Sequence, residues 1–120
     1  SLLERALADA QEQSDQLTVA EATVYLGACL SMLGEATEGA ALCAEGARLA
    51  QQSGLREAEM AAHLHLWGMA LARGDADAAR SCADRCQAEQ QDYVVPLFRN
   101  AYQELCARHA AVGAAPEQPH

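Results

Sequence analysis

Apolar residues recur along this chain at the three- and four-residue spacing of α-helices, separated by short polar turns that often contain glycine. This pattern predicts helices over about 2–13, 19–33, 36–53, 56–73, 76–91 and 96–112. Residues 14–17 are expected to form a turn between the first two helices. The tail over 113–120 holds two prolines and little to bury, so it is expected to be disordered.

Turn residues mark the predicted helix ends. Gly34 and Gly74 each follow a helical stretch, and glycine readily takes the left-handed conformation of a helix C-terminus. Thr18, with a glutamate three residues later, is expected to form a capping box that begins the second helix. Asp75 is expected to cap the fifth helix, and Pro96 suits the first turn of the sixth. The chain is therefore predicted to be all-α, with about six helices.

When the sequence is aligned with itself at an offset of 40 residues, similar residues coincide at many positions. Gly34 falls on Gly74, and Leu26 falls on Leu66. Further matches carry less weight because many are between alanines: Ala22 with Ala62 and Tyr102, Leu30 with Ala70, Leu2 with Leu42 and Cys82, and Ala6 with Gly46 and Cys86. A single helical hairpin cannot bury both of its faces, so the repeat predicts antiparallel hairpins that stack on one another.

These residues resemble a known family. The resemblance is carried by Ala22, Leu26, Gly27, Leu30, Gly34, Gly39, Cys43 and Gly46 in one copy, and by Leu66, Trp67, Gly68 and the segment GDADAAR in the next. Both runs are similar to tetratricopeptide repeats, which implies a short right-handed superhelix over residues 1–112. The repeat here is near 40 residues rather than 34, and the usual proline after the second helix is missing. The longer repeat resembles those of large bacterial transcriptional regulators and signalling ATPases.

Composition supports helices and narrows the range of partners. Half of the residues are apolar, but only five are aromatic, and alanine and leucine dominate. The net charge is −9, and all eight basic residues are arginines, which argues against direct binding of nucleic acid or anionic membranes. The absence of lysine suggests a bacterial source of high GC content. No stretch is long and apolar enough to cross a bilayer.

The five cysteines are odd in number and fall inside predicted helices, as expected of a reduced, cytoplasmic protein without a disulfide framework. Cys82 and Cys86 could form a zinc site with His63 and His65, but their repeat positions predict core packing, and no metal or other cofactor is expected. No cysteine has an evident base beside it. Acidic pairs such as Glu57 with Glu59 and Asp75 with Asp77 lie at helix starts, where they stabilise the helix dipole. No catalytic residue and no enzyme activity are therefore predicted.

The resemblance implies a concave face lined by the first helix of each hairpin, where a partner would bind. By position, this face holds Glu21, Val24, Ala28, Ser31, Leu64, Gly68, Leu71, Glu104 and Arg108. Trp67 sits beside it and could anchor a partner, although burial between hairpins is the simpler interpretation. A mainly apolar face would suit a helix or an extended apolar peptide.

Three functions remain open from the sequence. The first is a protein-interaction module, serving as the regulatory or sensor region of a bacterial transcription factor. The second is an effector domain that binds a small molecule or peptide in its groove, and the third is a structural scaffold. The sixth helix is expected to leave Leu97, Phe98, Tyr102 and Leu105 uncovered. We therefore expect the chain to be part of a longer protein, or two copies to associate through their repeat ends.

Overall fold

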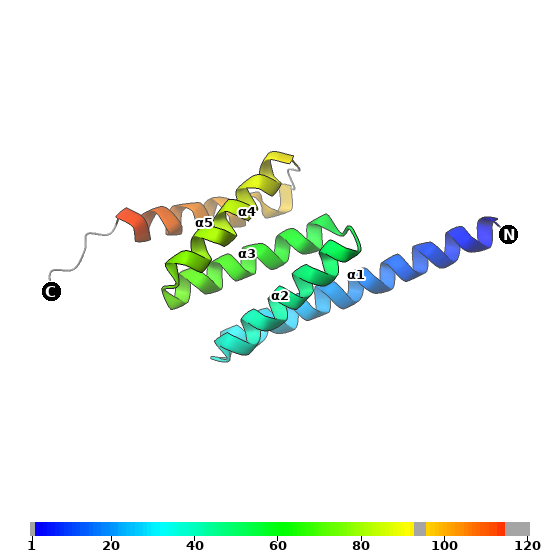
Figure 1. The fold of residues 1–120 in the computed structure, drawn as a ribbon, viewed down its shortest axis with the longest axis horizontal. Helices are drawn as coiled ribbons and strands as arrows, with labels where there is room; N and C mark the ends of the chain where they lie inside the picture. Colours follow the sequence, from blue (N-terminus) through cyan, green and yellow to red (C-terminus); the bar gives the residue numbers. More distant parts are fainter. Residues whose placement is uncertain (1, 93–95, 115–120) are drawn as a thin grey trace.

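The computed structural model describes residues 2–92 and 96–114, and every element in these ranges is an α-helix. The five helices are α1 (Leu2–Met32), α2 (Ala36–Gln52), α3 (Arg56–Arg73), α4 (Ala76–Asp92) and α5 (Pro96–Ala114). Consecutive helices run antiparallel and lie side by side (Figure 1). The molecule is elongated, with principal extents of 71 × 31 × 19 Å. The expected all-α class is confirmed for the described residues.

The count of six helices is wrong for these residues because the first two predicted helices are one, α1. Its 31 residues run through the expected turn at 14–17. No glycine or proline precedes Gly27, so nothing in the backbone forces a break. The Thr18 hydroxyl donates to the carbonyl oxygen of Ser14 at 3.0 Å, one turn back inside the helix. Thr18 is therefore an interior residue, and the predicted capping box is wrong.

The other predicted helix boundaries agree closely with the structure. Gly34, Gly54 and Gly74 all have positive φ values, between 68° and 94°, at the ends of α1, α2 and α3. The Asp75 carboxylate accepts a hydrogen bond from the backbone N–H of Ala78 at 3.1 Å, as an N-cap of α4 should. At the other end of the chain, α5 continues to Ala114, two residues into the predicted tail. Residues 115–120, the rest of that tail, lie outside the described residues.

The two capping assignments give a matched prediction. Asp75→Ala is expected to lower the free energy of unfolding by about 1 kcal/mol, because the first turn of α4 loses its acceptor. Thr18→Ala is expected to leave it unchanged or raise it by a few tenths of a kcal/mol, since alanine is the better helix former and no cap is lost. Urea unfolding followed by circular dichroism would measure both changes. A loss of about 1 kcal/mol for Thr18→Ala would mean that a helix does begin at this threonine.

The helices pack as neighbouring layers. Each helix contacts the next along the chain, and the odd-numbered helices also contact one another in order, α1 with α3 and α3 with α5. The buried side chains form three separate clusters. The largest joins α3, α4 and α5 around Trp67, Met60 and Cys86. The second joins α1, α2 and α3 around Val24 and Cys43, and the third is a small group of alanines: Ala20, Ala50 and Ala58.

Leu26 and Leu66 test the 40-residue repeat because they are equivalent positions. Leu66 is half-buried against the cluster that joins α3 to the preceding hairpin, whereas Leu26 is 52% exposed. The repeat thus places both leucines on the face that would meet a preceding hairpin, and no described helix covers that face of α1. This face of the first hairpin is therefore largely solvent-facing, with Ala22 and Leu33 exposed as well.

The first hairpin owes its close packing to glycine. A Cβ atom built on Gly39 of α2 would lie 2.5 Å from the carbonyl oxygen of Gly27 on α1. A Cβ atom on Gly27 would lie 2.6 Å from the carbonyl oxygen of Gly39. Gly46 meets the Val24 side chain in the same way. The backbones of α1 and α2 are thus in direct contact, which only residues without side chains allow.

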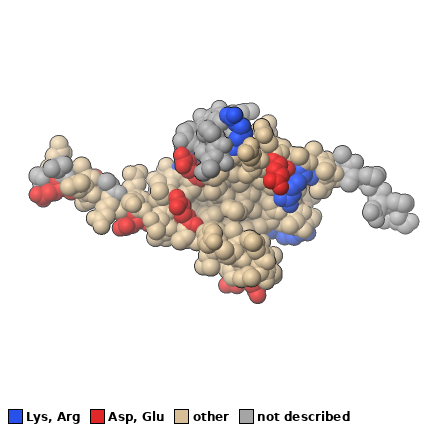
Figure 2. Space-filling view, turned by 180° about the vertical axis from the view of Figure 1, so that it is seen from behind, with Lys and Arg blue, Asp and Glu red and all other residues tan. Residues whose placement is uncertain are grey.

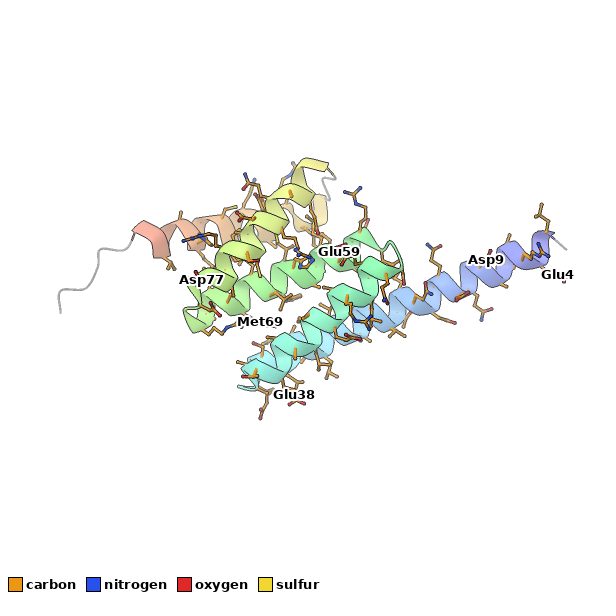
Figure 3. The ribbon with its side chains drawn as sticks, in the orientation of Figure 1. Glu4, Asp9, Glu38, Glu59, Met69 and Asp77 are labelled. Carbon is orange, nitrogen blue, oxygen red and sulfur yellow. The ribbon has the colours of Figure 1, made fainter. Side chains whose placement is uncertain are left out.

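The two ends of the stack differ from expectation. On α5, Phe98 and Tyr102 pack partly against the large cluster and Leu105 is buried, so this helix is not left uncovered as predicted. The side chain of Leu97 lies outside the described residues. The first half of α1 instead projects beyond the other helices, with Glu4 and Asp9 far from any of them (Figure 3). Among the described residues, no helix is long and apolar enough to span a membrane.

Candidate functional site

A groove with a volume of about 420 Å³ lies between the odd-numbered helices. Small residues of all three helices, such as Ala28, Gly68 and Ala101, leave room for it. The apolar side chains of Leu64, Met69, Phe98 and Leu105 line it further, and the polar members are Ser31, His65, Glu104 and Arg108. Seen from behind, the face formed by α1, α3 and α5 is mainly uncharged at its centre (Figure 2).

The structure brings together most of the residues that were predicted to form a binding face. The groove is lined by Ala28, Ser31, Leu64, Gly68, Glu104 and Arg108. Glu21 and Val24 line a neighbouring hollow of about 170 Å³, and it shares Ala61 and His65 with the groove. The predicted set therefore extends over two adjoining hollows on one face of the molecule.

Two predicted residues lie elsewhere. Trp67 is only 2% exposed, and it packs in the large cluster between α3 and α5 rather than on the groove. Its indole N–H donates to Nδ1 of His109 at 3.0 Å, and its ring lies 6.0 Å from that of Tyr102. Leu71 lines a different hollow, beside Gly74 and Val112. Trp67 thus holds α5 against α3, and neither residue can touch a ligand in the groove.

The groove carries few charges. Desolvation lowers the pKa of His65, so its imidazole is neutral at pH 7. Glu104 and Arg108 stand one turn apart on α5 and are the two charged residues that line the groove. A ligand would therefore meet an apolar floor, with one acidic and one basic side chain on α5. Such a surface selects for an apolar partner more than for a charged one.

The two fully buried cysteines are poorly suited to thiol chemistry. Burial raises the pKa of Cys43 to about 11 and that of Cys86 to about 12. Both thiols are therefore protonated at pH 7, the opposite of what a nucleophile requires. All five cysteines are free. Cys86 lies fully buried in the large cluster with Cys82 packed beside it, which agrees with their expected core positions.

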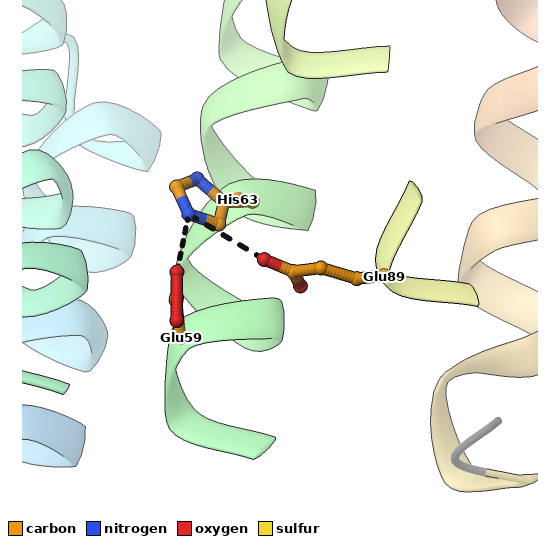
Figure 4. Close-up of side chains that lie close together, drawn as sticks. All are labelled: Glu59, His63 and Glu89. Atoms are coloured by element: carbon orange, nitrogen blue, oxygen red, sulfur yellow. Dashed lines mark ion pairs between the residues drawn. The ribbon is translucent and has the colours of Figure 1, made fainter. Parts of the chain in front are cut away.

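Sequence reasoning missed one polar cluster, formed by Glu59, His63 and Glu89 (Figure 4). Glu59 and His63 stand one turn apart on α3, and Glu89 reaches across from α4. The sequence suggests a zinc site only for His63 with His65 and the cysteines, and it predicts that Glu59 stabilises the helix dipole. The spacing of four residues between Glu59 and His63 was a visible signal that they share a face of one helix. The approach of Glu89 could come only from the packing of α4 on α3.

Comparison with known proteins does not assign this chain to a family. No family model, no curated protein and no solved structure matches this chain. The likeness to tetratricopeptide repeats accordingly rests on the residues of the chain itself.

Proposed function

We propose that this chain is a non-enzymatic protein-interaction module that binds the apolar face of a helical segment in the groove between α1, α3 and α5. The observation that carries the proposal is the groove itself, about 420 Å³ in volume and lined mainly by apolar and small side chains. A mainly apolar hollow of this kind favours a partner with an apolar surface, because burying that surface away from water is favourable.

A helical ligand suits the groove better than an extended one. Its small floor residues Ala28, Ala61 and Gly68 give the depth that an apolar helix face needs, while Leu64 and Phe98 provide contact area. Amphipathic helices bind such grooves through apolar anchors spaced three and four residues apart. Glu104 and Arg108 would then meet charged residues beside those anchors and orient the ligand.

The tetratricopeptide resemblance supports the same class. Proteins of this family stack helical hairpins and bind partners along the face of their first helices, and the groove here lies on the corresponding helices. We include in the proposal a right-handed superhelical arrangement and a role as the regulatory region of a bacterial transcriptional regulator. The raised pKa values of Cys43 and Cys86 support the absence of thiol-based catalysis.

A selection experiment tests the groove directly. Helical peptides would be selected from a random amphipathic library against the 120-residue chain, and their affinities measured by fluorescence anisotropy. Ala101→Arg places a large charged side chain in the groove and is expected to weaken selected peptides at least about tenfold, equivalent to about 1.4 kcal/mol. The matched control is Ala107→Arg, an equally exposed position on α5 outside the residues that line the groove.

Each outcome bears on the proposal. Loss of binding in Ala101→Arg alone supports a peptide groove. Equal binding by both variants, or a library that yields no binder, rejects it. A small-molecule effector is the alternative: compounds that raise the melting temperature of the wild type but not of Ala101→Arg, with no selectable peptide, would replace the peptide proposal with that function.

A further inference from the structure

The cluster of Glu59, His63 and Glu89 lies between α3 and α4, on a part of the molecule that the groove does not include. Nε2 of His63 is 3.5 Å from Oε2 of Glu59 and 3.9 Å from Oε1 of Glu89. One donor atom from each of the three residues lies within 4.8 Å of the others. The three side chains point toward one common space (Figure 4).

The buried imidazole is left unsatisfied in this arrangement. His63 is 6% exposed, and its Nε2 atom is buried without a hydrogen-bond partner. The two carboxylates beside it are also largely buried, with side-chain exposures of 18% and 22%. Burying such groups without compensation is unfavourable, so a group that satisfies all three at once would stabilise the structure.

We propose that Glu59, His63 and Glu89 form a site for a divalent transition-metal ion, with zinc as the best fit. One nitrogen and two carboxylate oxygens are ligands that zinc accepts. At zinc–ligand bonds of about 2.0–2.1 Å, tetrahedral ligand atoms are about 3.4 Å apart. The observed separations of 3.5 and 3.9 Å approach this value. Glu59 and His63 also have the i, i+4 spacing by which one helix presents two metal ligands.

An ion could reach the site from solvent. Glu59 and Glu89 line a hollow of about 160 Å³ together with Arg56 and Met60. A hollow of this size holds several water molecules, and one of them would supply the fourth ligand. The three protein ligands thus leave one coordination position open toward this hollow.

Burial and the charged side chains of both helices act on the pKa values of His63 and Glu89. Burial lowers the pKa of His63, and the charge of Arg85 lowers it further, so the imidazole is neutral. Burial and the charge of Glu59 raise the pKa of Glu89 to about 6, while Arg85 and Arg56 act in the opposite direction. The two arginines oppose the binding of any divalent cation, so the choice of metal depends on the ligands. An imidazole nitrogen with only two carboxylates favours a transition metal over calcium or magnesium, which prefer more oxygen ligands.

A metal ion here would join the N-terminal part of α3 to the C-terminal part of α4, away from the turn at Gly74. Two of its ligands come from α3, which forms the middle of the binding groove, and the third from α4. The ion would consequently act as a structural clamp that fixes the second hairpin, and its binding would stabilise the folded chain by mass action.

Zinc titration of the full 120-residue chain tests the site. Isothermal calorimetry at pH 7.5, with a non-thiol reductant present, would give the affinity, and the melting temperature would be followed by circular dichroism. Glu59→Gln and Glu89→Gln keep the shape of each side chain while removing its charge. Each is expected to reduce zinc affinity at least about tenfold. Asp84→Asn, an exposed acid on α4, is the matched control and should bind zinc as the wild type does.

Cobalt distinguishes this site from the cysteines. Co²⁺ bound by Glu59, His63 and Glu89 is expected to show visible d–d bands without the near-ultraviolet charge-transfer band of a thiolate ligand. This measurement uses the wild-type chain and holds even if a glutamine variant folds poorly. A thiolate band, zinc affinity that is equal in all variants, or no binding of Zn²⁺ and Co²⁺ at all would each overturn the proposal.

Discussion

Trp67→Ala is expected to lower the free energy of unfolding by about 3–5 kcal/mol. Trp67 is among the largest fully buried side chains of the described residues and the centre of the cluster that joins α3, α4 and α5. Removing the indole leaves a cavity and also deprives His109 of the hydrogen-bond donor that links α5 to α3. A domain of this size is stable by only about 5–15 kcal/mol, so the variant should be close to unfolding at 37 °C.

Two further variants separate the causes of this loss. Trp67→Phe keeps most of the apolar volume but removes the indole N–H, and a loss of about 1–2 kcal/mol is expected. Tyr25→Ala removes an aromatic ring that is 73% exposed and should change stability by less than about 0.5 kcal/mol. Urea unfolding at 222 nm suits all three because it does not depend on tryptophan fluorescence. A loss below 1 kcal/mol for Trp67→Ala would contradict the packing of α5 on α3.

Gly39→Ala is expected to lower the free energy of unfolding by about 2 kcal/mol. The new methyl carbon would lie 2.5 Å from the carbonyl oxygen of Gly27 and 2.8 Å from the backbone nitrogen of Ser31. Because both are backbone atoms, the conflict can be relieved only if α1 and α2 move apart. Overpacking of this kind costs about 1–3 kcal/mol or more, which outweighs the gain of up to about 1 kcal/mol from the helix propensity of alanine.

Gly68→Ala is the matched control for this change. It is the same substitution in a helix interior, but the nearest atom would be the Leu105 side chain at 3.7 Å, an ordinary contact. It should therefore stabilise the chain by up to about 1 kcal/mol. Gly27→Ala should behave like Gly39→Ala, and the double variant should lose less than the sum, because the first methyl group already separates the helices. Equal effects at Gly39 and Gly68 would show that α1 and α2 are not in backbone contact.

Local signals predicted most of the helix ends, because each depends on a residue with a particular backbone preference. Gly34, Gly54 and Gly74 end helices through positive φ values, and Asp75 caps α4. The break at 14–17 was wrong because Ser14, Thr18 and their polar neighbours are only weak helix breakers, and no glycine or proline supports them. A serine or threonine can satisfy its hydroxyl inside a helix as well as at its start, so sequence alone could not decide.

Side-chain surroundings were harder to predict than helix ends. The face that holds Leu64, Glu104 and Arg108 follows from the helical period once the hairpins are known to stack. Trp67 departs from it because adjacent positions on a helix point about 100° apart, which turns it away from Gly68. Leu71 shares the stripe of Leu64 and Gly68, but it lies further along α3, beside Gly74 and Val112. Glu89 joins His63 across two helices, which depends on the register of α4 against α3. Neither the direction of α5 nor the register of α4 against α3 can be predicted from the sequence of a single helix.

The three buried clusters are separate and do not merge into a single hydrophobic core. In such an arrangement each helix is stabilised by the helices that it contacts directly, and not by the chain as a whole. Damage at Trp67 should loosen α4 and α5 while α1 and α2 stay paired, and damage at Gly39 should do the reverse. Substitutions in one cluster could therefore change the packing at one end of the molecule without unfolding the other end.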